Sequence, residues 1–538
     1  MRLSAPRSPL TITGAGRTIS WLLDVRANDR PDQVFFVWEP FAGPGRAYTY
    51  REFARAVARV AGGLRQRGIG VGDHVLVFMD NCPELLLTWF ACARLGAVTV
   101  FANTRSAPDE LRYCAEHSGA IAAVTQPSYA SIVAAALPKA HAVFVISYNP
   151  TDEEGVSVRN APEQAFDRLL TGEVAAEASC GALDPAYVLY TSGTTGRPKG
   201  VVWTHANALW AAKVNAAHEG LTAQDRHLVC LPLFHVNAQS YGVLASLWVG
   251  SSFILQPRFS ASRFWEVSMR HHCTWTSQIY FSLRVLATGA IPESHSYRLW
   301  GTGMSGHPLE STFRVPMIGW WGMTETISHP IIGDCILPNR AQTIGYAATE
   351  YEVAVVDEDG APVEAGETGE LLVRGTPGIS LFAGYLHDPV ATANAFDANG
   401  WFKTGDRVTV HADGAFVFAD RTKDMLKVGG ENVAASEIER VVATLPGVRE
   451  VAVVGAPDPM LQEVPIAFVI AADDRPDLAS AILTSCRDKL SDFKVPREVR
   501  LVTDLPRSTL EKVAKSQLRD ALRREFEAAK DNVEGVHN

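Results

Sequence analysis

The chain has 538 residues, of which 47% are hydrophobic and 20% charged, and its formal net charge is −10. This length exceeds what one hydrophobic core usually serves, so we expect at least two domains. These fractions are ordinary values for a soluble globular enzyme. The acidic charge balance argues against a nucleic-acid partner, because phosphate contacts require clustered Lys and Arg side chains.

Three features favour a cytoplasmic protein. Residues 1–18 are polar and contain three arginines without an apolar core, which does not fit a secretory signal. The eight cysteines form no Cys-x-x-Cys pair and no zinc-like spacing, so we expect reduced thiols. The most apolar window, residues 85–102, is interrupted by Arg94 and Gly96, so we expect no membrane span.

The first part of the chain alternates helix and strand patterns. Thr49 and Glu52 have the spacing of a capping box ahead of apolar residues at helical intervals, and residues 75–79 form an apolar run of strand length. A helix from Pro83 and a buried strand at 97–101 follow. This alternation predicts an α/β fold, with a mostly parallel sheet covered by helices. No residue before about position 149 points to chemistry.

The strongest chemical motif runs from Tyr190 to Val201 and reads Tyr-Thr-Ser-Gly-Thr-Thr-Gly-Arg-Pro-Lys-Gly-Val. Its hydroxyls, backbone N–H groups and single ammonium can all donate to phosphate oxygens, which favours a polyphosphate ligand. The common NTPase P-loop is excluded, because Pro198 precedes the lysine, Gly200 follows it and a strand pattern comes next. A glycine-rich surface turn is the alternative. The residues concerned are Thr191, Ser192, Gly193, Thr194, Thr195 and Lys199.

Two later segments also combine groups of chemical interest. Residues 231–239 are an apolar run that meets a histidine and two amides, and we interpret them as a strand entering a pocket; a structural histidine is the alternative. Residues 320–326, Trp-Trp-Gly-Met-Thr-Glu-Thr, offer a ring, a hydroxyl and a carboxylate within a few positions. A carboxylate near a triphosphate is expected to act through Mg²⁺, which prefers carboxylate and phosphate oxygens.

The C-terminal part carries three more motifs. Residues 401–406 place an aspartate after a tight glycine turn, a pattern that an ordinary Asx turn also fits. Residues 420–433 are charged and contain a Gly-Gly-Glu-Asn run, and a linker between domains would explain the charges alone. Residues 505–515 contain Pro-Arg, a short loop and two lysines. Strands near 451–454 and 466–470 and a helix at 436–445 predict a small α+β domain, with a frayed tail after Phe526.

In this order the motifs resemble those of the adenylate-forming superfamily, which includes acyl-CoA synthetases, luciferases and the adenylation domains of peptide synthetases. The resemblance spans nearly the whole chain and is nearest to acyl-CoA synthetases like crotonobetaine/carnitine-CoA ligase. It implies a large N-terminal α/β domain, residues 1–420, and a small mobile α+β C-terminal domain, residues 421–538. It also implies ATP-dependent activation of a carboxylic acid to an acyl-adenylate, followed by transfer to CoA.

The resemblance assigns roles to individual residues. The loop from Thr191 to Lys199 would bind the ATP phosphates, and His235 would close over the acyl site. The remaining nucleotide and metal contacts would be Gly303, Met304 and Trp321 for adenine, Thr324 for the α-phosphate, Glu325 for Mg²⁺, Asp406 for the ribose, and Arg421 for the ribose or a phosphate. Gly429 and Gly430 would line the pantetheine tunnel for CoA, and Lys427 would be a further cofactor-binding residue. Lys423 would be the hinge, and Lys512 would stabilise the charge that develops during adenylation.

Two departures from the family pattern leave alternatives open. Trp321 stands where tyrosine is more usual, and Glu511 precedes Lys512 where the family has glycine. The alternatives are adenylation with a non-CoA acceptor, as in an amide ligase or a nitrite-activating diazotase-type enzyme, and a degenerate ligase that only binds nucleotide. For Lys512 a solvated surface lysine remains an alternative, as does an ordinary turn for residues 299–308.

The expected partners are a small carboxylic acid or other oxyanion, ATP and CoA; whether the chain forms a homodimer stays open. The resemblance places the acyl pocket near these residues: His235, Asn237, Gln239, Gly303, Met304, Gly322 and Thr326. The two amides favour a short or functionalised acid, although amides also satisfy backbone groups.

Overall fold

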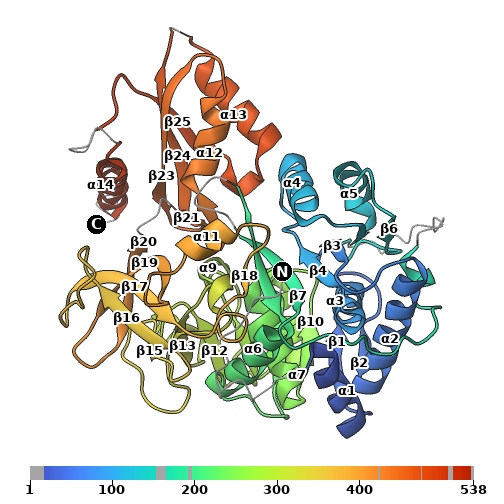
Figure 1. Cartoon of the computed structure of the whole chain (residues 1–538). Coiled ribbons are helices and arrows are strands. Elements are labelled where there is room, and N and C mark those ends of the chain that lie inside the picture. Colours follow the sequence, from blue (N-terminus) through green and yellow to red (C-terminus); the bar gives the residue numbers. More distant parts are fainter. Residues whose placement is uncertain are drawn as a thin grey trace.

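The computed structural model describes residues 17–152, 165–191, 197–421, 425–473, 475–506 and 513–534. These residues form four sheets. Figure 1 shows a large body built from the first three sheets and a small body, coloured orange to red, that lies on top of it.

The first sheet is mostly parallel. In spatial order its strands are β15 (Tyr346–Ala347), β14 (Ile331–Ile332), β13 (Met317–Trp321), β12 (Leu299–Thr302), β11 (Trp275–Ser277), β9 (Arg226–Val229), β10 (Ser252–Leu255), β1 (Val34–Trp38) and β2 (Arg46–Thr49). Every neighbouring pair from β13 to β1 is parallel. The carboxyl ends of these strands therefore meet at one edge, which is where open α/β sheets bind ligands.

The second sheet is also mostly parallel. Its strands, in spatial order, are β18 (Gly384–Tyr385), β8 (Lys199–Thr204), β7 (Pro185–Thr191), β4 (Val98–Phe101), β3 (His74–Phe78), β5 (Ala122–Thr125) and β6 (Ala142–Val145). The pairs from β7 to β6 are parallel, whereas β8 runs antiparallel to both β7 and β18. The mostly parallel sheet expected from the alternating pattern is confirmed.

Helices cover both faces of these sheets. In the large body they are α1 (Ile19–Asp29), α2 (Tyr50–Gln66), α3 (Pro83–Leu95), α4 (Pro108–Ser118), α5 (Ala130–Ala136), α6 (His205–His218), α7 (Ala245–Val249), α8 (Ala261–Arg270), α9 (Tyr280–Ala287), α10 (Glu310–Phe313) and α11 (Pro389–Asn394). A π-helix, Asn237–Leu244, leads into α7, and short 3₁₀ turns are Pro127–Tyr129, Phe166–Arg168 and Thr324–Thr326; a further 3₁₀ turn, Asp492–Lys494, belongs to the small body. The capping box of Thr49 and Glu52 starts α2 as predicted.

The main apolar core lies between the two large sheets, where it includes Phe36 of β1, Trp89 of α3 and Trp203 of β8. Smaller clusters occupy the outer faces, under α4 and α5 on the second sheet and under α8 and α9 on the first. The third sheet is antiparallel, in the order β16 (Glu352–Val356), β17 (Thr368–Arg374), β19 (Phe402–Val410) and β20 (Phe416–Arg421).

The small body is an α+β unit, as expected. Its strands are β22 (Glu431–Ala434), β21 (Met425–Val428), β24 (Gln462–Ala471), β23 (Val448–Asp458) and β25 (Glu498–Leu501), and its helices are α12 (Ala435–Ala443), α13 (Leu478–Lys489) and α14 (Lys515–Glu534). Alternate residues of β23 face opposite ways, so Val453 packs with α12 and α13 while Val454 packs with α14. The sheet is therefore covered on both faces (Figure 1).

Two local predictions were wrong. Residues 231–239 are not a strand: β9 ends at Val229, and the π-helix begins at Asn237. The side-chain amide of Asn81 donates to the carbonyl of Leu231 and accepts from the N–H of Leu233. This amide takes the place of a neighbouring strand as the hydrogen-bond partner of residues 231–233. The tail after Phe526 continues as α14 to Glu534 instead of fraying, because Leu518 and Leu522 anchor this helix on the sheet.

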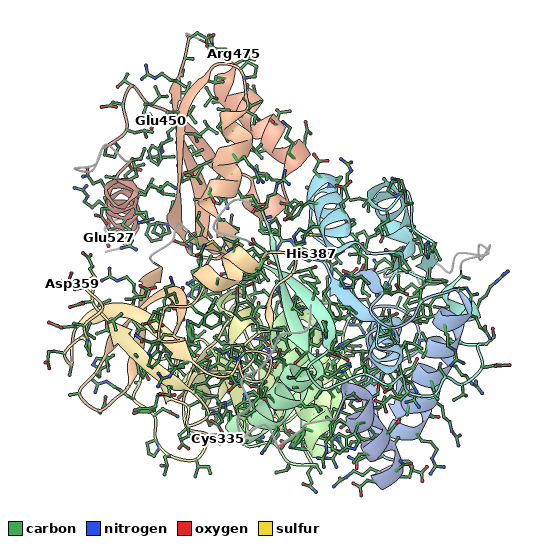
Figure 2. All side chains as sticks on the ribbon, viewed as in Figure 1. Cys335, Asp359, His387, Glu450, Arg475 and Glu527 are labelled. Atoms are coloured by element: carbon green, nitrogen blue, oxygen red, sulfur yellow. The ribbon has the colours of Figure 1, made fainter. Side chains whose placement is uncertain are left out.

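All eight cysteines are free thiols. Figure 2 places Cys335 at the end of the molecule opposite the small body, on which Glu450 and Arg475 lie. Within the described ranges no helix is both long and apolar enough to cross a membrane.

Candidate active site

Several predicted site residues of the large body follow the carboxyl ends of parallel strands. Gly303 and Met304 come directly after β12, and Thr324 and Glu325 form a 3₁₀ turn just after β13. His235 lies in the loop between β9 and the π-helix. These strands are neighbours in one sheet, so segments far apart in the sequence meet at a single edge.

The motif at residues 320–326 and the motif at residues 401–406 are joined directly by a buried hydrogen bond. Trp321 Nε1 donates to Asp406 Oδ2 at 2.9 Å, and both side chains are buried. Asp406 lies in β19 of the third sheet, where its backbone N–H donates to Thr404 Oγ1 at 3.0 Å. The bond fixes the edge of the indole ring against the carboxylate and so links the first sheet to the third.

A tyrosine connects the phosphate motif with Glu325. Tyr385 Oη donates to Glu325 Oε1 at 2.9 Å, and Lys199 Nζ lies 4.6 Å from the centre of the Tyr385 ring. Burial, and then the neighbouring Glu325, raise the pKa of Tyr385, which keeps the phenol protonated as a donor. Trp203 Nε1 also donates to the Thr324 carbonyl at 3.0 Å. The carboxylate and the ammonium thus belong to one cluster.

The phosphate loop is framed by a hairpin. Thr191 ends β7, Lys199 begins β8, and the two residues pair across the antiparallel ladder. Four further predicted phosphate contacts, Ser192, Gly193, Thr194 and Thr195, lie outside the described residues. So do Lys423 and Lys512. Arg421 ends β20, where its backbone pairs with that of Asp406.

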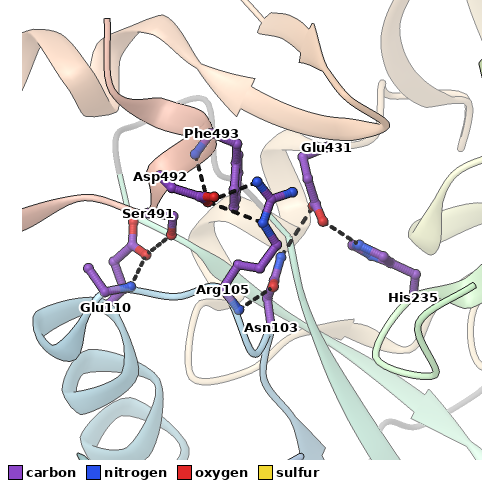
Figure 3. A network of polar contacts seen from close by, with 9 residues as sticks. Asn103, Arg105, Glu110, His235, Glu431, Ser491, Asp492 and Phe493 are labelled. Atoms are coloured by element: carbon purple, nitrogen blue, oxygen red, sulfur yellow. Dashed lines mark hydrogen bonds and ion pairs between the residues drawn. The ribbon is translucent and has the colours of Figure 1, made fainter. Parts of the chain in front are cut away.

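The small body contacts the same edge through the start of β22. His235 Nε2 lies 3.2 Å from Glu431 Oε1, and Asn103 Nδ2 donates to Glu431 Oε2 at 3.2 Å (Figure 3). Burial alone would lower the pKa of His235, but the Glu431 carboxylate outweighs it and raises that pKa. Burial likewise opposes ionisation of Glu431, yet His235 and the nearby Arg105 lower its pKa. Each group thus favours the charged form of the other, and the contact joins the two bodies.

Glycine is required beside this pair. Gly429 and Gly430 have φ of 60° and 92°, which an L side chain rarely adopts. A Cβ on Gly430 would lie 2.5 Å from Cδ1 of Ile279, so the backbone of the small body passes against the wall of the large one. Lys427, also predicted here, lies in β21 with its Nζ 4.8 Å from the centre of the Phe418 ring.

A second charged cluster joins the bodies next to α4. Lys494 Nζ lies 2.5 Å from Glu110 Oε1 of α4 and 2.9 Å from Glu437 Oε1 of α12, and all three side chains are buried. Ser491 Oγ donates to Glu110 Oε2 at 2.5 Å. Burial opposes ionisation of Glu110, but Lys494 lowers its pKa, whereas burial raises the pKa of Glu437. Arg105 adds an ion pair with Asp492 at 2.8 Å (Figure 3).

Sequence reasoning missed several of these residues. Asn103, Arg105 and Glu110 lie in the part of the chain from which no chemistry was expected, and Tyr385 was not singled out. A signal existed for the first two, because they directly follow the carboxyl end of buried strand β4. Glu110 and Tyr385 gain their partners only through the fold.

Two expected pocket residues serve the backbone instead. Gln239 Nε2 donates to the carbonyl of Leu233, and the Gln239 side chain is buried. Thr326 Oγ1 accepts from Met323 N at 3.0 Å and is also buried. Asn237 remains half-buried in the first turn of the π-helix.

Comparisons with known proteins agree with this architecture. Residues 23–386 match the AMP-binding enzyme family, and residues 437–512 match the AMP-binding enzyme C-terminal domain. The chain therefore belongs to the AMP-binding enzyme family.

Individual relatives cover nearly the whole chain. A crotonobetaine/carnitine–CoA ligase of Salmonella paratyphi C is 32% identical over 94% of this chain and 99% of its own length. The o-succinylbenzoate CoA synthetase of Bacillus subtilis, as a double mutant bound to its product analogue, is 27% identical with a TM-score of 0.80, over 93% of this chain and 98% of that one. The same synthetase in complex with AMP has a TM-score of 0.65 at equal identity and coverage.

Proposed function

We propose that the protein is an AMP-forming acid–CoA ligase, which activates a carboxylic acid with ATP and transfers the acyl group to CoA. The observation that carries the proposal is the convergence at one sheet edge of Trp321 with Asp406, and of Lys199 with Glu325 through Tyr385. A ring, a buried carboxylate, an ammonium and a second carboxylate match the parts of a nucleoside triphosphate. The identity to CoA ligases over almost the full chain supports the same reaction.

We assign the nucleotide contacts as follows. The adenine lies against Trp321 and the backbone at Gly303 and Met304, and its ribose is held by Asp406 and Arg421. The phosphates are held by the hairpin loop: Thr191, Ser192, Gly193, Thr194, Thr195 and Lys199. Thr324 bonds the α-phosphate. Because Asp406 already accepts a hydrogen bond from Trp321, the indole orients the carboxylate that meets the ribose.

Glu325 fits a magnesium ion. Its carboxylate is buried and lies in one cluster with Lys199, the ammonium of the phosphate loop. No group of three or more His, Cys, Asp or Glu side chains able to hold a metal occurs among the described residues. Mg²⁺ bound there would take its other ligands from phosphate and water, which is usual for this ion, and would neutralise phosphate charge.

The reaction has two steps. A carboxylate oxygen of the acid attacks the α-phosphorus, the bond to the β-phosphate oxygen breaks, and pyrophosphate leaves from an acyl-adenylate. The thiolate sulfur of CoA then attacks the acyl carbon, and AMP leaves with the bonding electron pair. The protein contributes mainly positioning and charge stabilisation, with Lys512 acting in the first step.

The arrangement of the two bodies suits the second step. Gly430 touches Ile279 and Glu431 pairs with His235, so the Gly429–Gly430 turn and Lys427 border the acyl site where pantetheine must arrive. The higher TM-score to the product-analogue complex than to the AMP complex of one synthetase supports this assignment. We place the domain boundary between residues 420 and 421, with Lys423 as the hinge for rotation towards the first step.

Pyrophosphate release tests the proposal. Purified protein is given Mg·ATP and a panel of short, branched, aromatic and quaternary-ammonium acids, each with and without CoA, with products identified by mass. We expect release that depends on one class of acid and yields its CoA thioester. Release without a thioester would support an amide ligase, and release with nitrite a diazotase-type enzyme. If none of the acids gives pyrophosphate release, the ligase assignment is refuted.

A further inference from the structure

The indole of Trp320 lies flat across the neighbouring strand. Trp320 is in β13, and a Cβ on Gly301 of β12 would overlap its ring, so only glycine permits this placement. Trp300, the residue before Gly301, packs on the opposite face with Phe264 and Phe313. Gly301 and the indole therefore face the π-helix side of the sheet.

Aromatic neighbours clamp this indole in place. The ring of His329 stacks on it with centroids 4.5 Å apart and planes inclined by 15°, and Tyr241 of the π-helix lies at 5.2 Å. Trp275 of β11 lies at 6.1 Å. Burial lowers the pKa of His329 well below its usual range, so the stacked imidazole is neutral. Packing on several sides leaves the indole little freedom to swing away.

The clamped indole nevertheless stays half-buried. Strand β13 lies between β12 and β14, and Tyr241 of the π-helix packs on this face, so the indole occupies the space between the helix and the sheet. Gly322 lies two residues further along on the same face, where a Cβ would meet Ser328 O at 2.6 Å and Tyr241 Oη at 2.9 Å, so this space is filled as well. Trp320 and these groups therefore occupy the face of the sheet beside Thr324, to which we assign the α-phosphate.

The room left for an acyl group follows from strand geometry. Two residues of a strand span about 7 Å, so the indole lies only that far beyond Gly322. A neighbouring cavity beside the π-helix, lined by His227, Asn237 and Ser277, is no larger than one water molecule requires. In the described part of the chain Asn237 Oδ1, Ser277 Oγ and His227 Nδ1 have no hydrogen-bond partner. These unpaired polar atoms disfavour an apolar chain in that cavity.

We propose that Trp320, laid across Gly301, closes the acyl pocket and restricts the enzyme to short-chain carboxylic acids. The inference rests on the proposed ligase function and names its substrate class. Trp320 acts by excluding volume and takes no part in the chemistry. A long alkyl chain would have to displace a clamped indole or enter the polar cavity, whereas a short acyl group fits above the ring.

The test measures chain-length preference. Wild type and Trp320→Ala are assayed for kcat/KM with acetate, butyrate, hexanoate, octanoate and decanoate. Wild type should prefer the shorter acids, and the variant should raise the ratio of octanoate to butyrate about 100-fold, since pocket fit discriminates at this scale. Wild type using decanoate as well as butyrate, or an unchanged ratio in the folded variant, would overturn the inference.

Two additions keep the test decisive. If Trp320→Ala does not fold, Trp320→Leu replaces it, because leucine keeps an apolar side chain in the core. The matched control is Trp265→Leu, which removes an indole from α8 on the opposite face of the sheet and should leave the chain-length preference unchanged. Calorimetry with non-hydrolysable acyl-adenylate analogues of the same acids gives a binding readout without turnover. If the decanoyl analogue binds tightly to wild type, the short pocket is refuted but the ligase function is not. Failure of every acid and every analogue refutes the ligase function, and the inference with it.

Discussion

The ion cluster around Lys494 predicts a variant that separates the two half-reactions. Glu110 belongs to the large body, whereas Lys494 and Glu437 belong to the small one, so the Glu110–Lys494 contact exists only in this arrangement of the bodies. Glu110→Gln removes the charge but keeps an acceptor for the Ala107 N–H, which now bonds Glu110 Oε2 at 2.9 Å. Helix α4 should therefore start normally.

The magnitude follows from the strength of the charged hydrogen bond between Glu110 and Lys494. A hydrogen bond to a charged group contributes about 1.5–3 kcal/mol, and its removal weakens one domain arrangement only. The population of that arrangement, and with it thioester formation, should drop roughly 10- to 100-fold. Adenylation, which we propose to use another arrangement, should keep its rate.

Single-turnover experiments measure both steps. Pyrophosphate release reports adenylation, and thioester formation from preformed acyl-adenylate and CoA reports the second step. Glu116→Gln, at an exposed position of the same helix, is the matched control and should change neither rate. An equal loss in both half-reactions, or unchanged thioester formation in Glu110→Gln, would show that the cluster does not select a domain arrangement.

Three further predictions concern the same site. Lys512→Ala should lose adenylation far more than thioester formation from preformed adenylate, and equal loss in both would exclude its assigned role. Gly430→Ala places a Cβ on Ile279 at a φ of 92°, so we expect at least about tenfold slower thioester formation with normal pyrophosphate release; Gly360→Ala, with φ of 81° and open space, controls for backbone strain. Glu431 raises the pKa of His235, so their ion pair contributes fully below about pH 6.5 and is lost as pH rises through that raised pKa. The ratio of wild-type to Glu431→Gln thioester rates should therefore fall with increasing pH, and a pH-independent ratio contradicts the ion pair.

Helix caps, strands and short motifs of this protein could be predicted from the sequence, because they depend on local physical chemistry. Thr49 and Glu52 cap α2 whatever surrounds them, and the apolar runs at 75–79 and 97–101 become strands β3 and β4 because strand length and burial are encoded locally. The motifs around Trp321, Glu325 and Asp406 identified the family for the same reason, since each is a short contiguous pattern. The strand predicted at residues 231–239 was wrong, because the backbone of Leu231 and Leu233 is hydrogen-bonded by Asn81, about 150 residues away.

Only the tertiary structure decided which groups meet. The pairs Trp321–Asp406, Glu325–Tyr385, His235–Glu431 and Glu110–Lys494 are separated by 60 to 384 residues, and no local pattern marks one partner for the other. The depth of the proposed acyl pocket would likewise be a tertiary property, because it would depend on an indole of one strand lying over a glycine of the next. Sequence determines the chemistry that each segment carries, while the packing of sheets and domains determines the distances at which that chemistry acts.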